Sequence, residues 1–103
     1  MSMNIQSVTS EGKTLVRVSG EVDVSNADEL RGAVGEALES DCPCVEVDLG
    51  EVSYIDSTGI GVLVGAARHA AEASRQFLVS HPQRNVARVL SLLGVSDELG
   101  VKQ

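Results

Sequence analysis

The 103-residue sequence predicts an α/β fold, and three observations carry that prediction. Residues 45–49 alternate apolar and acidic side chains, as a half-buried strand does, and residues 58–72 follow with apolar side chains at helical spacing. Residues 77–79 then form a short apolar run that is typical of a buried strand. A strand, a helix and a second strand in this order predict a βαβ unit, whose crossover is right-handed in nearly all known folds.

Two strands and a helix are predicted ahead of this unit. Residues 4–9 and 13–19 predict a hairpin, with residues 10–12 as its turn. Gly20 interrupts the second strand, which predicts a β-bulge or, as the alternative, a close approach of another backbone segment. Ser25 is expected to cap a helix whose apolar stripe has helical spacing: Leu30, Val34, Ala37 and Leu38.

A further helix is predicted after residues 77–79. We expect it to start at His81-Pro82, because proline is tolerated in a first turn, and to stop at Gly94. Val95 can close a hydrophobic contact behind that glycine, and residues 96–98 predict the cap of one last turn. Residues 1–103 are expected to form one domain. The apolar stripe of the helix is Val86, Val89, Leu90 and Leu93.

The net charge of −7 argues against a nucleic-acid-binding protein, which needs a basic surface. Residues 1–56 carry 12 acids and 3 bases, so this half favours a basic or mixed protein surface as its partner. The start of the chain is polar, and the best apolar run, residues 60–67, is far shorter than the ~20 residues of a membrane-spanning helix. We therefore expect a cytoplasmic protein that binds neither nucleic acid nor membrane and is monomeric when free.

The two cysteines predict neither a structural disulfide nor a metal site. Cys42 and Cys44 flank Pro43 and are too close in sequence for an unstrained bridge. His69 and His81 are the only histidines, so the sequence has too few of the usual soft ligands for a metal centre. We expect two ordinary thiols, with no bound metal and no cofactor.

The segment Asp56-Ser57-Thr58-Gly59 joins the central strand to its helix and forms the main candidate site. Small polar residues directly before a helical pattern supply an N-cap, because their oxygens accept hydrogen bonds from the first N–H groups of the helix. A phosphate on Ser57 would lie at the positive end of the helix, where free N–H groups tolerate its charge. The alternative is that Ser57 is a structural cap with no further function.

This segment does not predict an enzyme. It lacks the first glycine of a nucleophile elbow, and neither histidine has an evident third partner for a catalytic triad. Gly59-Ile60-Gly61 lacks the third glycine of a dinucleotide fingerprint, and the sequence holds no phosphate-binding P-loop. We therefore expect a protein that binds a partner rather than one that catalyses a reaction.

Two aspartates form a second candidate site. Asp23 and Asp56 each end a predicted strand, and strand ends in an α/β sheet converge where ligands tend to bind. Two carboxylates there could orient the Ser57 hydroxyl, bind a magnesium ion or act as a general base for phosphorylation. Equally, Asp56 could be a turn residue and Asp23 a solvated strand end.

One face of the central helix carries small residues and then a base: Ser57, Gly61, Gly65 and Arg68. Glycines at this spacing allow another backbone to come close. That backbone could belong to the same fold or to a binding partner.

Five segments of the chain resemble the STAS domain of bacterial anti-sigma factor antagonists, also called anti-anti-sigma factors. They are residues 18–23, 47–49, 54–63, 89–90 and 93–95, and the resemblance extends from about residue 4 to residue 101. Asp-Ser-Thr-Gly-Ile-Gly-Val-Leu, at residues 56–63, is the most specific of these motifs. The resemblance implies a STAS fold, with a single mixed β-sheet of four to five strands flanked by about four α-helices.

The resemblance also implies a partner switch. The unphosphorylated protein would bind an anti-sigma factor that is also a serine kinase, and so release a sigma factor. The kinase would then phosphorylate Ser57, in preference to the adjacent Thr58, and a PP2C-type phosphatase would reverse this step. The alternative is a constitutive STAS-type scaffold or regulatory subunit, for example of a lipid-transport or sensory complex. The expected partner-binding residues are Asp23, Ser25, Asp56, Ser57, Thr58, Gly59, Gly61, Val62, Gly65 and Arg68.

Overall fold

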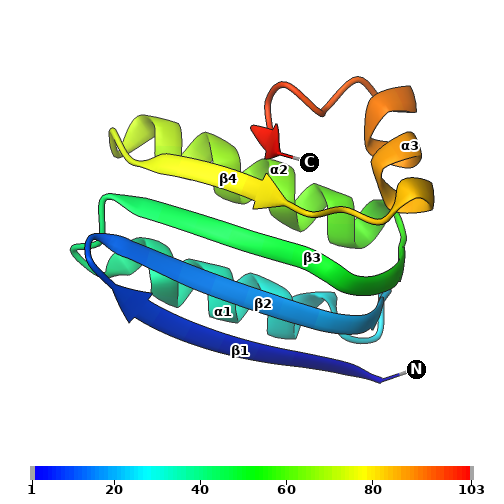
Figure 1. The fold of residues 1–103 in the computed structure, drawn as a ribbon, viewed down its shortest axis with the longest axis horizontal. Coiled ribbons are helices and arrows are strands. Elements are labelled where there is room, and N and C mark those ends of the chain that lie inside the picture. The colour runs from blue at the N-terminus through cyan, green and yellow to red at the C-terminus, as the bar shows by residue number, and fades with distance from the viewer. Residues whose placement is uncertain (1, 103) are drawn as a thin grey trace.

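A computed structural model describes residues 2–102 and shows a five-stranded sheet with the strand order β1-β2-β3-β4-β5 (Figure 1). β1 pairs antiparallel with β2, and the other neighbours pair in parallel. The elements are β1 (Met3–Ser10), β2 (Lys13–Val22), α1 (Ala27–Glu39), β3 (Cys44–Ile55), α2 (Ser57–Glu72), β4 (Gln76–Ser80), α3 (Arg84–Leu92) and β5 (Val101–Lys102). The predicted α/β class and mixed sheet are confirmed.

Three helices are present within residues 2–102, rather than about four. Residues 96–98, predicted to cap a last helical turn, lie in a turn. Leu99 directly after them is fully buried, so this segment packs on the core without forming a helix.

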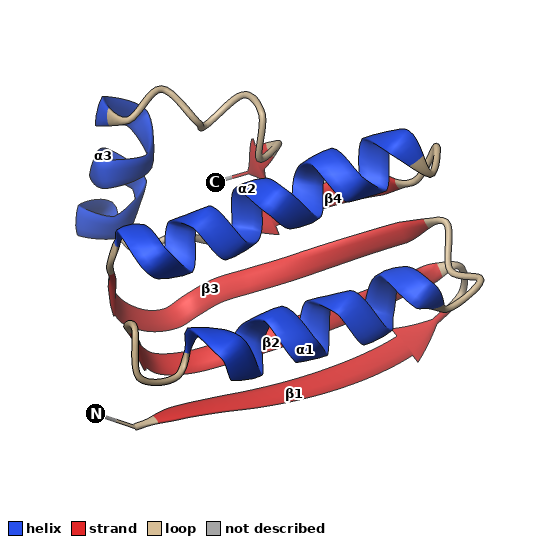
Figure 2. Ribbon diagram, turned by 180° about the vertical axis from the view of Figure 1, so that it is seen from behind, coloured by secondary structure: helices blue, strands red, loops and turns tan. Residues whose placement is uncertain are grey.

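The helices α1 and α2 cover one face of the sheet. Figure 1 shows the sheet in front of both helices, and Figure 2, from behind, shows both helices in front of the sheet. The opposite sheet face is polar, and cross-strand ion pairs join Lys13 to Glu46 at 2.8 Å and Arg17 to Asp48 at 3.8 Å. The hydrogen bond from Lys13 lowers the pKa of Glu46. One face of the sheet therefore builds the core, and the other is a charged surface.

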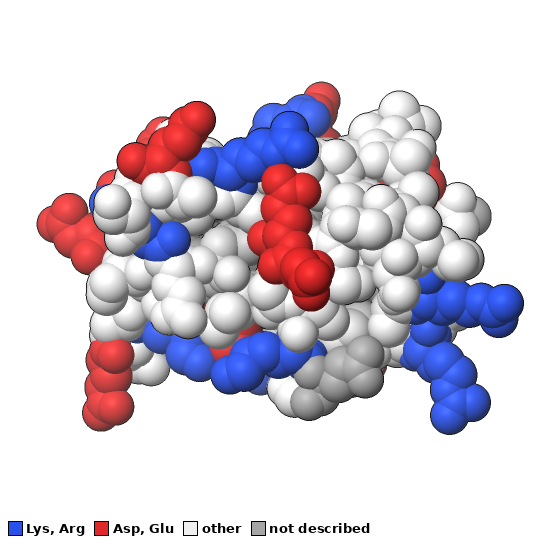
Figure 3. All heavy atoms as spheres, turned by 90° about the horizontal axis from the view of Figure 1, so that it is seen from above, with Lys and Arg blue, Asp and Glu red and all other residues white. Residues whose placement is uncertain are grey.

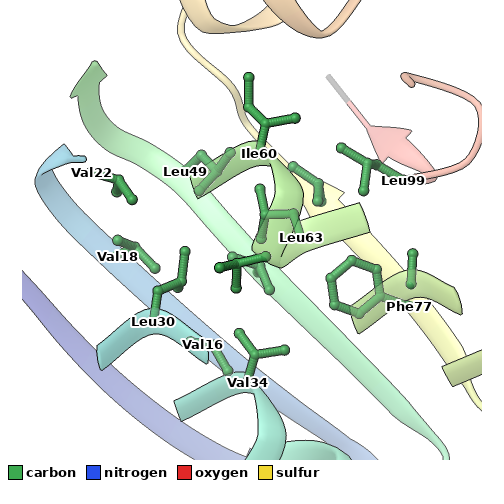
Figure 4. Packing of buried hydrophobic residues seen from close by; sticks show 14 of the residues in the cluster. Val16, Val18, Val22, Leu30, Val34, Leu49, Ile60, Leu63, Phe77 and Leu99 are labelled. Carbon is green, nitrogen blue, oxygen red and sulfur yellow. The ribbon is translucent and has the colours of Figure 1, made fainter. Parts of the chain in front are cut away.

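The core lies between the sheet and these two helices (Figure 4). Every residue of the predicted α1 stripe is buried. The apolar stripe that helical spacing predicts for residues 58–72 is Ile60, Leu63, Val64, Ala67 and Ala71. In α2, Ile60, Leu63 and Ala67 are buried and Val64 is half-buried. Ala71 is exposed, and Ala70 is buried in its place. Phe77 closes the β4 end of the same core.

The predicted hairpin is confirmed, and Gly20 shows both features that the sequence left open. The register between β2 and β3 shifts on either side of Gly20, which marks a bulge. A Cβ atom at Gly20, whose φ is +98°, would lie 2.2 Å from the carbonyl oxygen of Ser2. This close approach lets Ser2 accept a hydrogen bond from the N–H of Glu21 at 3.1 Å.

The helix α3 starts at Arg84, two residues after Pro82, so the predicted start at His81-Pro82 is too early. Its end is as predicted. Gly94 has a φ of +73° and donates to Ser91, and Val95 donates to Leu90 at 3.1 Å, which together form a Schellman motif.

The predicted apolar stripe of α3 is only half right. Val86 and Leu90 are buried, whereas Val89 and Leu93 are 38% and 56% exposed. β4 ends at Ser80, so the sheet beneath α3 is too narrow to cover the whole stripe.

Candidate functional site

The start of α2 is capped by Asp56, not by Ser57. Asp56 has an extended backbone, and its Oδ1 accepts hydrogen bonds from the N–H groups of Thr58 at 3.0 Å and Gly59 at 3.1 Å. Its carbonyl oxygen accepts the next bond, from the N–H of Ile60 at 3.0 Å. The alternative that Ser57 is the structural cap is therefore wrong, because Ser57 is the first residue of the helix.

The Ser57 and Thr58 side chains are both exposed. Since Asp56 already binds the N–H groups of Thr58 and Gly59, a phosphate on Ser57 would find fewer free donors than the sequence suggests. The helix dipole would still favour a negative charge there, whereas the Asp56 carboxylate would oppose it. The start of α2 would therefore stabilise a phosphate on Ser57 less than an uncapped helix would.

The loop between β2 and α1 uses its aspartate differently. Asp23 Oδ1 accepts hydrogen bonds from the Ser25 hydroxyl and, at 2.9 Å, from the Ser25 N–H. These bonds, the hydroxyl bond first, lower the pKa of Asp23. The N-cap of α1 is Asn26, which makes no capping side-chain bond, so the predicted cap role of Ser25 is wrong.

Asn26 instead holds this loop in place. Its Oδ1 accepts from the N–H of Asp23 at 3.0 Å, and its Nδ2 donates to the carbonyl oxygen of Glu21 at 2.9 Å. Val22 pairs with Ile55 in the sheet, and the N–H of Asp56 donates to the Val22 carbonyl at 3.1 Å. The two loops are therefore adjacent, which places Asp23 and Asp56 together at the carboxyl ends of β2 and β3, as expected.

The glycines of α2 have different surroundings. A Cβ atom at Gly59 would lie 2.7 Å from Val22 Cγ1 and 2.8 Å from Ile55 Cγ1, so this glycine is needed within the fold. Gly61 and Gly65 have nothing within 4 Å of the same position. The fold itself therefore leaves space beside these two glycines.

Gly61 and Gly65 line a groove of about 310 Å³ between α1 and α2. Val62 also lines the groove, but it is only 6% exposed and belongs mainly to the core. Arg68, on the same helix, donates to Glu98 Oε2 at 2.8 Å and so ties α2 to the C-terminal segment. Of the expected partner-binding residues on α2, Gly61 and Gly65 are the ones that the fold leaves free along the groove.

Several apolar side chains near Asp23 and Asp56 are exposed, and the sequence analysis did not predict their exposure. Val24 and Tyr54 flank the two aspartates and are 75% and 46% exposed. Leu92 and Leu93 are 76% and 56% exposed at the end of α3. Figure 3 shows an uncharged area at the upper right and two projecting basic side chains at the right below it. The available signal was the excess of apolar residues in the nine-residue α3, more than one helix face can bury.

Two side-chain amides hold α3 against the end of β3. Gln83 Nε2 donates to the carbonyl oxygen of Gly50 at 3.0 Å, and Asn85 Nδ2 donates to that of Ser53 at 2.9 Å. β4 pairs only with Cys44–Asp48, so these bonds occupy part of the edge that β4 leaves open. The exposed residues of α3 therefore share one end of the molecule with Ser57.

Residues 2–102 contain no group of three or more His, Cys, Asp or Glu side chains arranged to hold a metal ion. Cys42 and Cys44 are free thiols, and burial raises the pKa of Cys44. No helix in this part of the chain has both the length and the apolar character that crossing a membrane requires.

The chain is similar to proteins of one family over almost its whole length. A family model described as the Mlab STAS domain matches residues 5–101. An anti-sigma-B factor antagonist of Staphylococcus epidermidis is 28% identical over all of this chain and 95% of its own length.

Solved structures agree on the fold. An anti-sigma factor antagonist from Mycobacterium paratuberculosis has a TM-score of 0.89 at 24% identity, covering 97% of this chain and 85% of its own. The anti-sigma factor antagonist SpoIIAA in its unphosphorylated form has a TM-score of 0.79 at 19% identity, covering 99% and 89%. The phosphorylated form of the Bacillus SpoIIAA gives 0.73 at 16% identity, covering 99% and 92%. The predicted architecture is thus shared with known proteins.

Proposed function

The chain belongs to the STAS domain family, and we propose that it is an anti-sigma factor antagonist controlled by phosphorylation of Ser57. Its unphosphorylated form binds an anti-sigma factor that is also a serine kinase, and this releases a sigma factor. Phosphorylation of Ser57 by that kinase ends the binding, and a PP2C-type phosphatase restores it. The protein itself catalyses no reaction. The observation that carries the proposal is the exposed Ser57 at the first position of a helix that Asp56 already caps.

The proposed binding surface has a polar centre and an apolar margin. The centre is formed by the ends of β2 and β3 with the first turn of α2, and the margin is formed by Val24, Tyr54 and the end of α3. A surface of exposed apolar side chains around exposed hydroxyl groups suits a protein partner. Of the partner-binding residues expected from the sequence, five lie in the polar centre: Asp23, Ser25, Asp56, Ser57 and Thr58. Two more, Gly61 and Gly65, line the adjoining groove.

Charge gives the switch its direction. A phosphate adds a charge of about −1.5 to −2 to a surface that already holds the Asp23 and Asp56 carboxylates. Within an interface, such a group needs cationic partners, and an unpaired charge there costs several kcal/mol. Because Asp56 occupies two of the first N–H groups of α2, the helix offsets little of this cost. The phosphate would therefore block binding without unfolding the protein.

The competing hypothesis is a constitutive STAS-type subunit that binds its partner without phosphorylation. In its original form it gives Ser57 the role of a structural cap, and that part is excluded because Asp56 is the cap. What remains of the hypothesis is binding that does not depend on a modification at Ser57.

The test is intact-mass measurement after incubation with ATP and candidate anti-sigma kinases from the same genome. We expect one added phosphate, mapped by fragmentation to Ser57 and absent from Ser57→Ala. Thr58→Ala and Ser25→Ala are matched controls, because each removes a neighbouring hydroxyl, and both should still be phosphorylated. A stable complex with a candidate kinase but no phosphate on the protein would favour the constitutive subunit instead.

A further inference from the structure

The two edges of the sheet are protected very differently. β5 forms one edge with two residues, one of them Lys102. β1 forms the other with eight residues, none of them charged or proline, and it pairs with β2 without a register shift. Natural proteins usually protect such edges with charges, prolines, bulges or short strands. Figure 1 shows β1 as the last strand, with no further segment beside it.

The outward-facing backbone groups of β1 follow from its ladder with β2. Ser2 accepts a hydrogen bond from Glu21, and bonded and non-bonded pairs alternate along an antiparallel ladder. The even-numbered residues of β1 therefore bond to β2. The odd-numbered residues present their N–H and C=O groups to the outside: Met3, Ile5, Ser7 and Thr9.

A hollow lies under the second half of β1, on the side of the sheet that carries the helices. It has a volume of about 170 Å³ and is lined by Ser7 and Thr9 together with Ala33, Glu36 and Ala37 of α1. The first half of β1 carries larger apolar side chains on the same face, since Met3 and Ile5 pack half-buried against the core. The first half of β1 thus carries large apolar side chains on this face, and the second half carries small side chains above a hollow.

We propose that β1 is a self-association edge, at which two copies pair antiparallel about a two-fold axis through Gln6. In this register Ile5 lies opposite Ser7 of the second copy, and Met3 lies opposite Thr9. All four outward-facing residues of each copy are then paired, with about eight hydrogen bonds across the axis. The large apolar side chains of each copy, Met3 and Ile5, therefore lie beside the hollow of the other copy. The two sheets become one continuous sheet.

Charge and position set the properties of this pair. Each copy has a net charge of −7, so the copies repel one another at low salt, and added salt strengthens the dimer by screening. β2 and β3 separate β1 from α2, so Ser57 stays exposed in both copies. The dimer therefore presents two partner-binding surfaces. It departs from the expectation of a free monomer and does not depend on the proposed switch.

Disulfide trapping tests the register. Gln6 lies opposite itself across the axis in a non-bonded pair, where Cα atoms are about 4.5 Å apart, a distance that a disulfide spans. Gln6→Cys should therefore form a covalent dimer under mild oxidation of the purified full chain. Val8→Cys is the matched control on the same strand and sheet face. In this register Val8 lies opposite Asn4, so two copies of position 8 are about 13 Å apart. We expect cross-linking at least tenfold faster at position 6.

Sedimentation equilibrium over a range of concentrations and salt provides the second measurement. The wild-type protein should show a monomer–dimer equilibrium that shifts toward dimer as salt rises. Gln6→Lys places two ammonium groups across the axis and should shift it toward monomer. Equal cross-linking at positions 6 and 8, or a monomer at every concentration and salt, would overturn the proposal. A further contrary result would be that Gln6→Cys cross-links only to a different protein and forms no homodimer when purified. That result would overturn the proposal, because β1 would then pair with another protein rather than with a second copy.

Discussion

Two strand-to-helix connections lie side by side at the candidate site, after the carboxyl ends of β2 and β3, and they use the same residue types in different ways. β2 ends at Val22 and β3 at Ile55, residues that pair in the sheet, and an aspartate follows each. After Asp56 the helix begins at once. After Asp23, three more residues precede α1. The Asp23 carboxylate accepts hydrogen bonds from Ser25 and does not cap α1.

The difference shows what makes one serine available. The Ser25 hydroxyl is held by the carboxylate of Asp23. The Ser57 hydroxyl follows an aspartate whose carboxylate is already bonded to backbone N–H groups, so the helix does not need it. A capping aspartate directly before a serine therefore leaves that serine exposed without weakening the helix.

The largest expected effect is on partner binding. Ser57→Asp should weaken binding to the cognate anti-sigma factor at least about tenfold, which corresponds to about 1.4 kcal/mol, because it places a charge in the centre of the proposed interface. Ser74→Asp adds the same charge to an exposed turn at the other end of α2, outside the proposed surface, and should cost less than about threefold. Isothermal titration calorimetry measures both. Equal losses would mean that overall charge, rather than the position of Ser57, controls binding.

The next effect concerns how tightly the connection between β3 and α2 packs against the strand ends. Gly59→Ala should destabilise the fold by about 1–3 kcal/mol, because its methyl group would overlap Val22 and Ile55. Gly61→Ala, two residues further on, meets open space and should stabilise α2 by up to about 1 kcal/mol. Urea unfolding gives both values. A stable Gly59→Ala protein would show that the two strand ends can move apart.

A smaller effect separates the two aspartates. Asp56→Ala should cost about 1 kcal/mol, because two N–H groups of α2 lose their cap, while Asp56→Asn keeps an acceptor and should cost less. Asp23→Ala should also cost less than Asp56→Ala, since the Asp23 side chain does not cap α1. Thermal unfolding compares the three variants. The same loss from Asp23→Ala and Asp56→Ala would contradict the assignment of Asp56 as the only capping carboxylate of the pair.

The smallest effect depends on pH. The hydrogen bonds from Ser25 lower the pKa of Asp23, so the folded protein keeps this carboxylate ionised at lower pH than the unfolded chain does. Its contribution to stability is complete above the unfolded pKa of about 3.9 and is lost as pH falls through the lower pKa of the folded state. Asp23→Asn should therefore flatten the decline in stability below about pH 4. An unchanged decline in stability below about pH 4 in Asp23→Asn would contradict this prediction.

Local signals predicted the parts of the fold that depend on near neighbours in sequence. The α1 stripe, the hairpin and the Gly94 end of α3 each rest on a short pattern with a direct physical cause. The sequence placed the cap of α2 within the segment at residues 56–59 but could not single out its residue, because Asp56 and Ser57 are both good N-cap residues. Only the backbone conformation of Asp56 distinguishes them.

Environment beyond the local sequence explains the remaining differences. Gly59 and Gly61 are neighbours in one motif, yet one contacts the ends of two strands and the other lines an open groove. Helical periodicity identified the apolar side of α3 but not how much of it the sheet covers, so Val89 and Leu93 were placed in the core. The candidate site could be located from sequence, whereas its apolar margin required the arrangement of α3 beside β3.

The amide bonds that hold α3 have a consequence for how such proteins diverge. Gln83 and Asn85 bind backbone carbonyl oxygens of β3, which every sequence provides, so the position of α3 does not depend on its outward-facing residues. Leu92 and Leu93 can therefore change during evolution without moving the helix or disturbing the core. After gene duplication, such changes would let two copies acquire separate partners while both retain Ser57 and its capping aspartate. Under the proposed function, α3 is therefore where the partner preferences of related copies can diverge.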